Sequence, residues 1–328
     1  MILITGGAGY VGSHTSKALA KAGEEIVVFD NLSTGHLWAA KWGHFFKGDL
    51  KFQEDLERCF QEYPITAVIH FGALSLVGES MKMPEEYYFN NVLGTLNLLK
   101  VMRKSGVDKI VFSSSAAVYG EPVEIPIPES HPLKPVSVYG KTKVMMEMLM
   151  EDFFCAYGIR YAALRYFNAC GADPNGEIGE IHDPETHLIP NVFKVLRGEK
   201  EFLEIFGNDY PTPDGTPIRD YIHVCDLARA HLKALELLRK GENVGAVNLG
   251  SARGFSVMEI VRAVEKLFHK ELPKRIAPRR PGDPAVLVAS NEKAKQVLNW
   301  EPESSSLEEI VLSAFNFYES WSRSRKPE

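Results

Sequence analysis

The chain lacks the features that mark a membrane protein, a disulfide-rich secreted protein or a nucleic-acid-binding protein. No apolar run in its 328 residues approaches the roughly 18 residues that a membrane-spanning helix needs. Its four cysteines, Cys59, Cys155, Cys170 and Cys225, are scattered without a Cys-x-x-Cys pair, which disfavours a disulfide or zinc framework. The net charge is −6, whereas proteins that bind nucleic acid usually carry a basic face.

What remains is the composition of an ordinary globular protein. Hydrophobic residues make up 45% and charged residues 24%, and the length suits two domains or one large domain with a smaller lobe. The sequence opens directly on the apolar run Ile2-Leu3-Ile4, which leaves no room for a signal peptide. We therefore expect a cytoplasmic protein with reduced cysteines that contacts neither a membrane nor nucleic acid.

A glycine-rich loop joins the first apolar run to a helical pattern. Gly6, Gly9 and Gly12 lie in Thr-Gly-Gly-Ala-Gly-Tyr-Val-Gly (5–12), and the helical pattern covers residues 13–21. Strand, glycine loop and helix are the context that a dinucleotide-binding turn requires. Gly6 permits a tight turn, Gly9 lets a pyrophosphate approach the helix N-terminus, and Gly12 allows close packing of helix on strand.

An acidic residue at the end of the second apolar run indicates which dinucleotide binds. Residues 26–29 are apolar and end in Asp30, 24 residues after Gly6. A carboxylate there can bond both ribose hydroxyls and would repel a 2′-phosphate. The alternative, that Asp30 only begins a turn before Asn31, does not account for the glycine loop before it. The predicted cofactor is NAD, and NADP is disfavoured.

Short apolar runs alternate with helical patterns through the first half of the chain. The apolar runs are residues 26–29, 45–46, 65–69, 109–113 and 161–167, and the helical patterns are 52–61, 85–104 and 139–157. This alternation predicts an α/β fold with a doubly wound, Rossmann-type parallel sheet and a smaller C-terminal α/β lobe. We expect residues 1–167 to form the NAD-binding domain, with 221–250 returning to it, and 168–220 and 251–328 to form the second lobe.

Tyr139 and Lys143 are four residues apart in a predicted helix. Such pairs also arise by chance, but positions i and i+4 share one helical face, so the phenol and the ammonium can point the same way. A neighbouring positive charge lowers a tyrosine pKa from its usual value of about 10, which makes the phenolate a usable base. Ser113, Ser114 and Ser115 end the apolar run before them, where a hydroxyl can bond a substrate oxygen.

Several motifs together resemble the extended short-chain dehydrogenase/reductases. They are the glycine loop, Phe-Ser-Ser-Ser-Ala-Ala-Val-Tyr-Gly (112–120), Tyr-x-x-x-Lys and Arg-Tyr-Phe-Asn (165–168). Three further stretches, 77–80, 184–190 and 207–212 running into 219–224, are similar to those of the UDP-glucose 4-epimerases in that family. The resemblance covers essentially the whole chain.

The resemblance implies interconversion of UDP-galactose and UDP-glucose. Tyr139 as phenolate would take the proton of the sugar 4-hydroxyl while hydride passes from C4 to tightly bound NAD. The transient 4-keto sugar would turn over, and hydride would return to its other face. In this scheme Lys143 lowers the pKa of Tyr139 and bonds the nicotinamide ribose, and Ser115 is the hydroxyl partner.

The resemblance also implies two sets of binding residues. The expected contacts to NAD are Gly6, Gly9, Tyr10, Val11, Gly12, Asp30, Asn31, Asp49, Leu50, Phe71, Gly72, Ala73, Asn90, Ser113, Ser114, Tyr139, Lys143 and Tyr166. The expected contacts to the UDP-sugar are Ser115, Tyr139, Asn168, Arg219, Tyr221, Arg280, Asp283 and Leu287.

Two positions depart from the family pattern. Ser75 stands where several members carry a basic residue near the cofactor phosphates. Leu287 aligns with the family's gate beside the hexose C2 substituent, where a large aromatic goes with exclusion of N-acetyl sugars and a small residue with acceptance. Leucine is intermediate, so 4-epimerases of UDP-N-acetylhexosamines, UDP-xylose or UDP-glucuronate stay open as alternatives. A dehydratase is disfavoured because Ala116 and Ala117 replace its Asp-Glu pair, and a non-enzymatic NAD-binding scaffold because Tyr139 and Lys143 are both present.

Two further expectations concern a metal and a partner. His182 and His187, with Asp183 and Glu185 between them, invite a metal interpretation, but their spacing is not a helical i,i+4 pair and the family loop needs no metal, so we expect none. The family is commonly homodimeric through two long helices, here 85–104 and 139–157. Met145, Met146, Met148, Leu149 and Met150 would supply its apolar surface, unless they only face the chain's own sheet.

Overall fold

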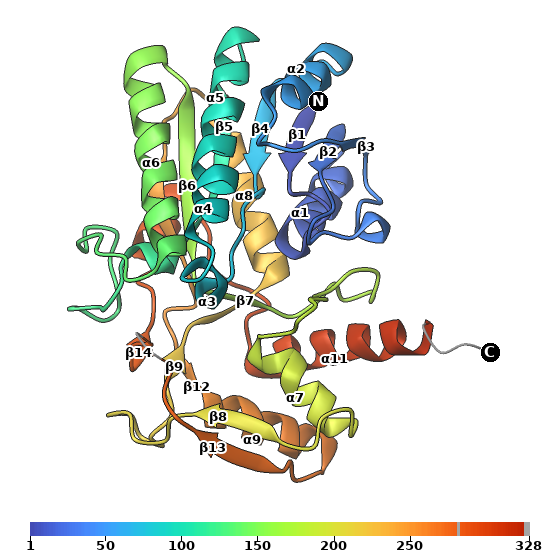
Figure 1. The fold of residues 1–328 in the computed structure, drawn as a ribbon, viewed down its shortest axis with the longest axis vertical. Coiled ribbons are helices and arrows are strands. Elements are labelled where there is room, and N and C mark those ends of the chain that lie inside the picture. The colour runs from blue at the N-terminus through green and yellow to red at the C-terminus, as the bar shows by residue number, and fades with distance from the viewer. Residues whose placement is uncertain (281–282, 325–328) are drawn as a thin grey trace.

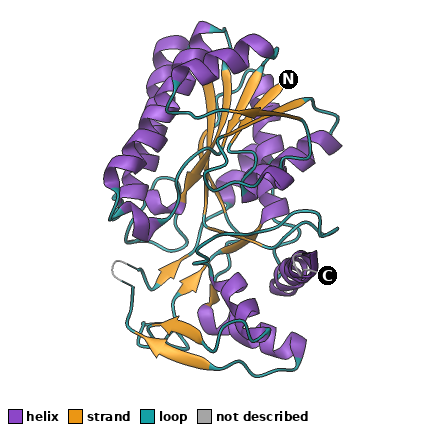
Figure 2. Cartoon of the chain, turned by 45° about the vertical axis from the view of Figure 1, so that its right-hand side comes forward, coloured by secondary structure: helices purple, strands orange, loops and turns teal. Residues whose placement is uncertain are grey.

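The computed structural model describes residues 1–280 and 283–324. Pro281 and Gly282, which separate Arg280 from Asp283, lie outside the described residues, as do residues 325–328 of the C-terminal tail. Figures 1 and 2 show a large sheet domain above a smaller lobe of short strands and helices.

A seven-stranded parallel sheet forms the centre of the larger domain. Its strands are β1 (Ile2–Thr5), β2 (Ile26–Asp30), β3 (His44–Lys47), β4 (Ala67–His70), β5 (Lys109–Ser115), β6 (Arg160–Tyr166) and β11 (Gly245–Leu249). Their order is β11-β6-β5-β4-β1-β2-β3, and Figure 1 labels the strands from β6 to β3. The predicted doubly wound sheet is confirmed. The order reverses between β1 and β4, and such reversal points are where ligands bind in open α/β sheets.

Helices cover both faces of this sheet. On one side α1 (Tyr10–Lys21) packs against α8 (Val224–Arg239), and on the other α5 (Gly94–Lys104) lies between α2 (Gln53–Glu62) and α6 (Val138–Tyr157). Neighbouring residues of one strand enter opposite cores, with Ile2 and Ile4 on the α1/α8 side and Leu3 on the other. Because both faces are buried, the strands appear in the sequence as continuous apolar runs.

The helix predicted over 85–104 is present but contains a π-helical turn. It consists of α4 (Pro84–Tyr87), a π-helical turn at Tyr88–Leu93 and then α5, and a short helix, α3 (Val77–Ser80), precedes it. A π turn adds a residue to the helical repeat and is often found at functional sites. The Asn91 amide, within this turn, bonds both the N–H and the C=O of Leu74 and the hydroxyl of Thr142.

Within the described residues, the smaller lobe consists of three small sheets and three helices. The strands are β7 (Asn168–Cys170) with β10 (Tyr221–His223), β9 (Ile218–Arg219) between β12 (Phe255–Ser256) and β14 (Val286–Leu287), and β8 (Leu203–Phe206) with β13 (Lys274–Ala277). The helices are α7 (Leu188–Leu196), α9 (Val257–Phe268) and α11 (Leu307–Ser324). Ser256 and Glu259 form a reciprocal capping box that begins α9.

The chain returns to the large domain twice. Strand β11, which ends the 221–250 segment, pairs with β6. Later, α10 (Glu292–Leu298) and Trp300 pack into the core on the α1/α8 side. The predicted boundary at residue 251 did not include this second return, which brings Ala294 and Leu298 under α8 and β11.

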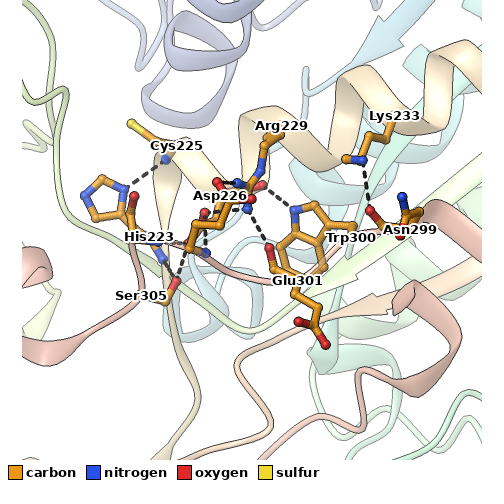
Figure 3. A network of polar contacts seen from close by, with 11 residues as sticks. His223, Cys225, Asp226, Arg229, Lys233, Asn299, Trp300, Glu301 and Ser305 are labelled. Carbon is orange, nitrogen blue, oxygen red and sulfur yellow. Dashed lines mark hydrogen bonds and ion pairs between the residues drawn. The ribbon is translucent and has the colours of Figure 1, made fainter. Parts of the chain in front are cut away.

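A buried carboxylate at the start of α8 fastens the segment that follows α10 (Figure 3). Asp226 accepts hydrogen bonds from the backbone N–H groups of Glu303 and Ser304 at 3.0 and 2.9 Å and from the Ser305 hydroxyl at 2.7 Å. Its own carbonyl accepts a bond from the indole of Trp300 at 3.0 Å. One side chain thus ties the sheet domain to the chain leading into α11.

All four cysteines are free thiols. None of the helices within 1–280 and 283–324 has the length and apolar character needed to cross a membrane.

Candidate active site

A cavity of about 440 Å³ lies at the carboxyl edge of the large sheet, where the lobe meets it. This is within the size range of small-molecule and cofactor sites. Its walls come from the β1–α1 turn, from the ends of β2, β4 and β5, from the start of α6 and from several lobe segments. The strand ends that the sequence singled out therefore meet around one space.

The glycine turn at the base of the cavity has no room for side chains. Gly6 has φ +69°, and a Cβ on it would lie 2.7 Å from the N atom of Gly72. A Cβ on Gly12 would lie 2.3 Å from the carbonyl oxygen of Gly6. Gly9 is the N-cap of α1, whose first turn carries no acidic side chain. Free N–H groups and the helix dipole there suit a phosphate group, so the turn fits a dinucleotide pyrophosphate.

Asp30 ends β2 at the wall of the cavity. Its carboxylate accepts hydrogen bonds from the backbone N–H groups of Ala8, at 3.0 Å, and Leu32, at 2.8 Å. Burial raises the pKa of this carboxyl group, and the two backbone bonds oppose that shift. The bond to Ala8 fixes the carboxylate next to the glycine turn, which is where a ribose acceptor is needed.

Tyr139, Lys143 and Ser115 converge on the same cavity. Ser137 begins α6 by accepting a bond from Gly140 N at 3.0 Å, which places Tyr139 in the first turn. The Lys143 ammonium lies 5.7 Å from the centre of the Tyr139 ring and donates to the carbonyl of Ser113 at 2.7 Å. Ser115 hydrogen-bonds the Tyr139 phenol. The predicted shared face of the helix is confirmed.

Burial shifts the pKa of both members of this pair. Burial raises the pKa of Tyr139, and the hydrogen bond from Ser115 opposes the shift. Burial also lowers the pKa of Lys143 to about 7, against the attraction of Glu147. With 9% and 2% of their surface exposed, both groups lose hydration that would stabilise charge. Burial therefore opposes the charged form of both groups.

The three serines of β5 do not face the same way. Ser113 and Ser115 line the cavity, and the Ser113 hydroxyl lies 2.5 Å from that of Tyr166. Ser114 points to the other face, where its hydroxyl donates to Glu147. Alternation along a strand explains this and could have removed Ser114 from the predicted cofactor contacts. Glu147 in turn forms a buried ion pair with Arg165.

The predicted substrate residues divide into those on the cavity wall and those behind it. Asn168, Arg219 and Leu287 line the cavity. Asp283 lies behind Arg219, which donates to its carboxylate at 2.5 Å. The guanidinium of Arg280 stacks 4.2 Å from the ring centre of Phe206.

Most of the residues predicted to contact the cofactor line the cavity. Some of the predicted cofactor and substrate residues do not. Those that line it are Gly6, Gly9, Tyr10, Val11, Gly12, Asp30, Asn31, Leu50, Phe71, Gly72, Ala73, Asn90, Ser113, Tyr139, Lys143 and Tyr166. Asp49, Ser114, Tyr221, Arg280 and Asp283 are not part of the wall. Asp49 acts one contact away, where it accepts a bond from Asn31 at 3.1 Å.

Two wall segments were not predicted from the sequence to line the cavity. Residues 33–39 fold over the glycine turn, where His36 N donates to Ala8 O at 2.9 Å. A Cβ on Gly35 would lie 3.0 Å from Ala8. The glycine at position 35 was therefore the one feature of the sequence that could have indicated this close approach. The other segment, 179–187, comes from the lobe. No periodicity marks such loops, because only tertiary contacts place them.

Comparisons with known proteins agree with the resemblance. The sequence model described as "NAD dependent epimerase/dehydratase family" matches residues 2–250. UDP-glucose 4-epimerase of Halalkalibacterium halodurans is 53% identical over 317 residues, covering 97% of this chain and 95% of that protein.

Solved structures agree as well. The UDP-glucose 4-epimerase of Brucella ovis in complex with NAD has a TM-score of 0.93 at 48% identity, covering 96% of this chain and 98% of that one. The enzyme of Bifidobacterium longum in complex with NAD⁺ and UDP has a TM-score of 0.91 at 39% identity, covering 97% and 98%. With relatives this similar over nearly its whole length, the chain belongs to the NAD dependent epimerase/dehydratase family.

Proposed function

We propose that this protein interconverts UDP-galactose and UDP-glucose by 4-epimerisation, with NAD as its resident cofactor. The observation that carries the proposal is the meeting of Tyr139, Ser115 and Lys143 with the glycine turn and Arg219 around one cavity. The relatives bearing the name UDP-glucose 4-epimerase support it. Bound in this cavity, NAD would supply the acceptor and then the donor of the hydride at the sugar C4.

The side chains of the cavity divide the remaining work. Tyr139 takes the proton from the 4-hydroxyl and returns it, while Ser115 holds the same oxygen by a hydrogen bond. Lys143 must keep its proton to favour the phenolate, and Glu147, one helical turn further along α6, raises its pKa against burial. Arg219 offers a planar guanidinium to the diphosphate. In this scheme residues 1–167 and 221–250 hold the dinucleotide and the lobe holds the UDP-sugar.

The glycine turn, Asp30 and Lys143 line the cavity together with Arg219 and Asn168. The first three would bind NAD and the last two the UDP group, so the hexose would lie between the two sets. Ala116 and Ala117 also line the cavity beside Ser115. Their methyl groups cannot move protons, which argues against a dehydratase that must eliminate water across C5–C6.

The test is conversion of UDP-galactose to UDP-glucose by the purified protein with no NAD added. Conversion would establish the epimerase activity and the retained cofactor together. Tyr139→Phe is the matched variant: it should keep the fold and the cofactor absorbance while kcat falls by about 10²- to 10⁴-fold, the contribution of general acid–base catalysis. No conversion even after NAD is supplied, or full activity of Tyr139→Phe, would refute the proposal.

We also propose a homodimer formed through α6 and the adjacent π turn. Met145 and Met148 on α6 are 40% and 59% exposed, and Phe89 in the turn is 50% exposed. Met146 and Met150 are instead buried against the chain's own sheet, so the apolar surface is smaller than the five residues suggested from the sequence.

Sedimentation at micromolar concentration tests the dimer. Met148→Glu should dissociate it, whereas Ile276→Glu, which changes a residue 50% exposed on β13, should not. Wild-type protein that sediments only as a species near 36.7 kDa would rule the dimer out. The cytoplasmic location expected from the reduced cysteines stays a prediction.

A further inference from the structure

A second cluster of reactive side chains lies in the loop between β7 and α7. Glu180, His182, Glu185 and His187 each turn one ligand atom toward a common point, and these atoms lie within 4.8 Å of one another. The sequence had suggested the two histidines with Asp183 and Glu185, and no metal was expected. The fold adds Glu180, which the sequence interpretation had not considered, and Asp183 is not part of the cluster.

Four nitrogen-to-oxygen separations within the cluster lie near those of a tetrahedral site. His182 Nδ1 lies 3.4 Å from Glu180 Oε1 and 3.7 Å from Glu185 Oε2. His187 Nδ1 lies 2.8 Å from Glu180 Oε1 and 3.3 Å from Glu185 Oε1. Four ligand atoms at zinc bond lengths of about 2.0–2.1 Å in a tetrahedron lie about 3.3 Å apart. The observed separations bracket that value.

Further hydrogen bonds position the residues of the cluster, as is common around metal sites. The Glu185 carboxylate, 3% exposed, also accepts a bond from the backbone N–H of His187 at 2.7 Å. The Asn191 amide donates to the carbonyls of His187 and Glu185 at 2.8 and 3.2 Å. Such outer contacts orient metal ligands. Nδ1 of His182 is buried and faces the carboxylates of Glu180 and Glu185, so it is directed into the cluster.

The charge of the cluster calls for a cation. Two carboxylates that are 10% and 3% exposed need positive charge beside them, because unpaired charge in a buried position is costly. A divalent ion bound to neutral imidazoles cancels both carboxylate charges. Imidazole nitrogens and carboxylate oxygens are both ligand types that Zn²⁺ accepts.

The geometry points to a structural zinc site formed by Glu180, His182, Glu185 and His187. Four protein ligands fill the coordination shell, so no position is left open for catalysis. Its role is to fix the loop 179–187, which forms one wall of the cavity. The site stands independently of the sugar that the enzyme accepts.

The rival explanation is an ion cluster without metal. Burial opposes charge on His182, but its contacts with Glu180 and Glu185 outweigh burial and hold its pKa at about 9. Both histidines could then be protonated and neutralise the carboxylates themselves. The two explanations predict different metal contents.

The test is the zinc content of full-length, untagged protein after dialysis against a low-affinity zinc buffer, measured by elemental mass spectrometry. The expected result is about one zinc per chain, removed by a strong chelator and restored by added Zn²⁺, with a higher thermal midpoint when zinc is bound. Cobalt should replace it with the intense visible bands of a tetrahedral site. Protein without zinc, which added Zn²⁺ neither enters nor stabilises, would overturn the proposal.

Matched variants place the metal at this cluster. His182→Ala should weaken zinc binding by more than about 100-fold, since loss of an outer partner alone costs about 10- to 100-fold. Glu185→Gln keeps the side-chain shape and should also weaken binding, which guards against misfolding of the alanine variant. His44→Ala, at an exposed position on the edge strand β3, should leave the zinc content unchanged. Equal zinc in wild type and in both cluster variants would refute the assignment.

Discussion

Leu287 lies on the cavity wall from the two-residue strand β14, directly beside Arg219 of β9. The sequence separates these residues by 68 positions, counted as 287 minus 219. If Arg219 binds the diphosphate, the side chain at 287 stands next to the attached sugar and limits the room for its substituents.

Changing that side chain should therefore change the choice of sugar. We expect Leu287→Tyr to lower kcat/KM for UDP-N-acetylglucosamine relative to UDP-glucose by about 10- to 100-fold, the range in which pocket size discriminates between substrates. Leu287→Ser should shift the ratio in the opposite direction. Competition assays with the two sugars measure it, and an unchanged ratio in both variants would show that Leu287 is not the gate.

Glu147 illustrates a residue whose importance the sequence did not reveal. Its carboxylate, on the same helix as Tyr139 and Lys143, is buried and accepts hydrogen bonds from Arg165 Nε at 2.9 Å and from Ser114. Arg165 also donates to Tyr119 at 2.9 Å. Helix α6 is apolar nearly all round. The sequence therefore does not indicate whether a polar residue in it is a buried ion-pair partner or an exposed charge.

Glu147→Gln should lower the free energy of unfolding by about 3 kcal/mol, because it leaves the Arg165 charge buried without a counter-ion. Urea denaturation measures the change. Asp152→Asn, which alters an exposed carboxylate on the same helix, should stay within about 0.5 kcal/mol of wild type. Equal stabilities for the two variants would mean that the ion pair contributes nothing.

Helix α8 shows how one element joins two parts of the chain. Its buried face packs against α1 and the sheet, while Asp226 in its first turn binds three groups of the segment 303–305 (Figure 3). Lys233, further along the helix, donates to the carbonyl of Asn299 at 2.8 Å. The connection between α10 and α11 is therefore fixed by α8.

Asp226→Asn should release that connection. The amide keeps the size of the carboxylate but replaces one acceptor oxygen by an NH₂ donor. That donor would face the N–H and hydroxyl groups of 303–305, which also donate. Since hydrogen bonds to a charged group contribute about 1.5–3 kcal/mol, the free energy of unfolding should fall by at least about 2 kcal/mol. Hydrogen exchange of residues 300–306 should rise in the variant. Unchanged exchange there would contradict the role assigned to Asp226.

Sequence patterns did not predict every feature of these elements. They missed the π turn within the helix expected over 85–104, and they did not place the segments 33–39 and 179–187 on the cavity wall. Apolar periodicity located α5 because one face of it is buried. It did not reveal the π turn at 88–93, because that distortion serves the contacts of Asn91 with Leu74 and Thr142, residues from other elements.

The whole molecule carries several buried, neutral histidines that link its stability to pH. Burial lowers the pKa of His14 to about 4, of His70 to about 3 and of His231 to about 4. In the unfolded chain these groups titrate near 6.5. Below that pH the unfolded state binds protons that the folded state does not, so stability falls as pH drops from about 6.5 toward 4 and is independent of these groups above it.

Removing one of these histidines should reduce that acid sensitivity. His231→Phe loses the bond from Nδ1 to Leu227 O and should be less stable than wild type at pH 7.5. As pH falls from 6.5 to 4, its stability relative to wild type should rise by up to about 1.4 kcal/mol per unit. Urea denaturation at several pH values measures this, with exposed His269→Asn as control. A stability difference that does not change with pH would show that His231 is protonated in the folded protein.

The sequence by itself determined the doubly wound sheet, the glycine turn, Asp30 and the Tyr139–Lys143 pair. Each depends on short-range rules: the repeat of a strand or helix, the φ angle that only glycine adopts freely, or the four-residue spacing on a helical face. The tertiary structure alone decided that Ser114 faces away from the cavity, that Leu287 lies beside Arg219, and that Glu180 joins two histidines. These depend on which segments fold against each other, and no local pattern encodes contacts between distant loops.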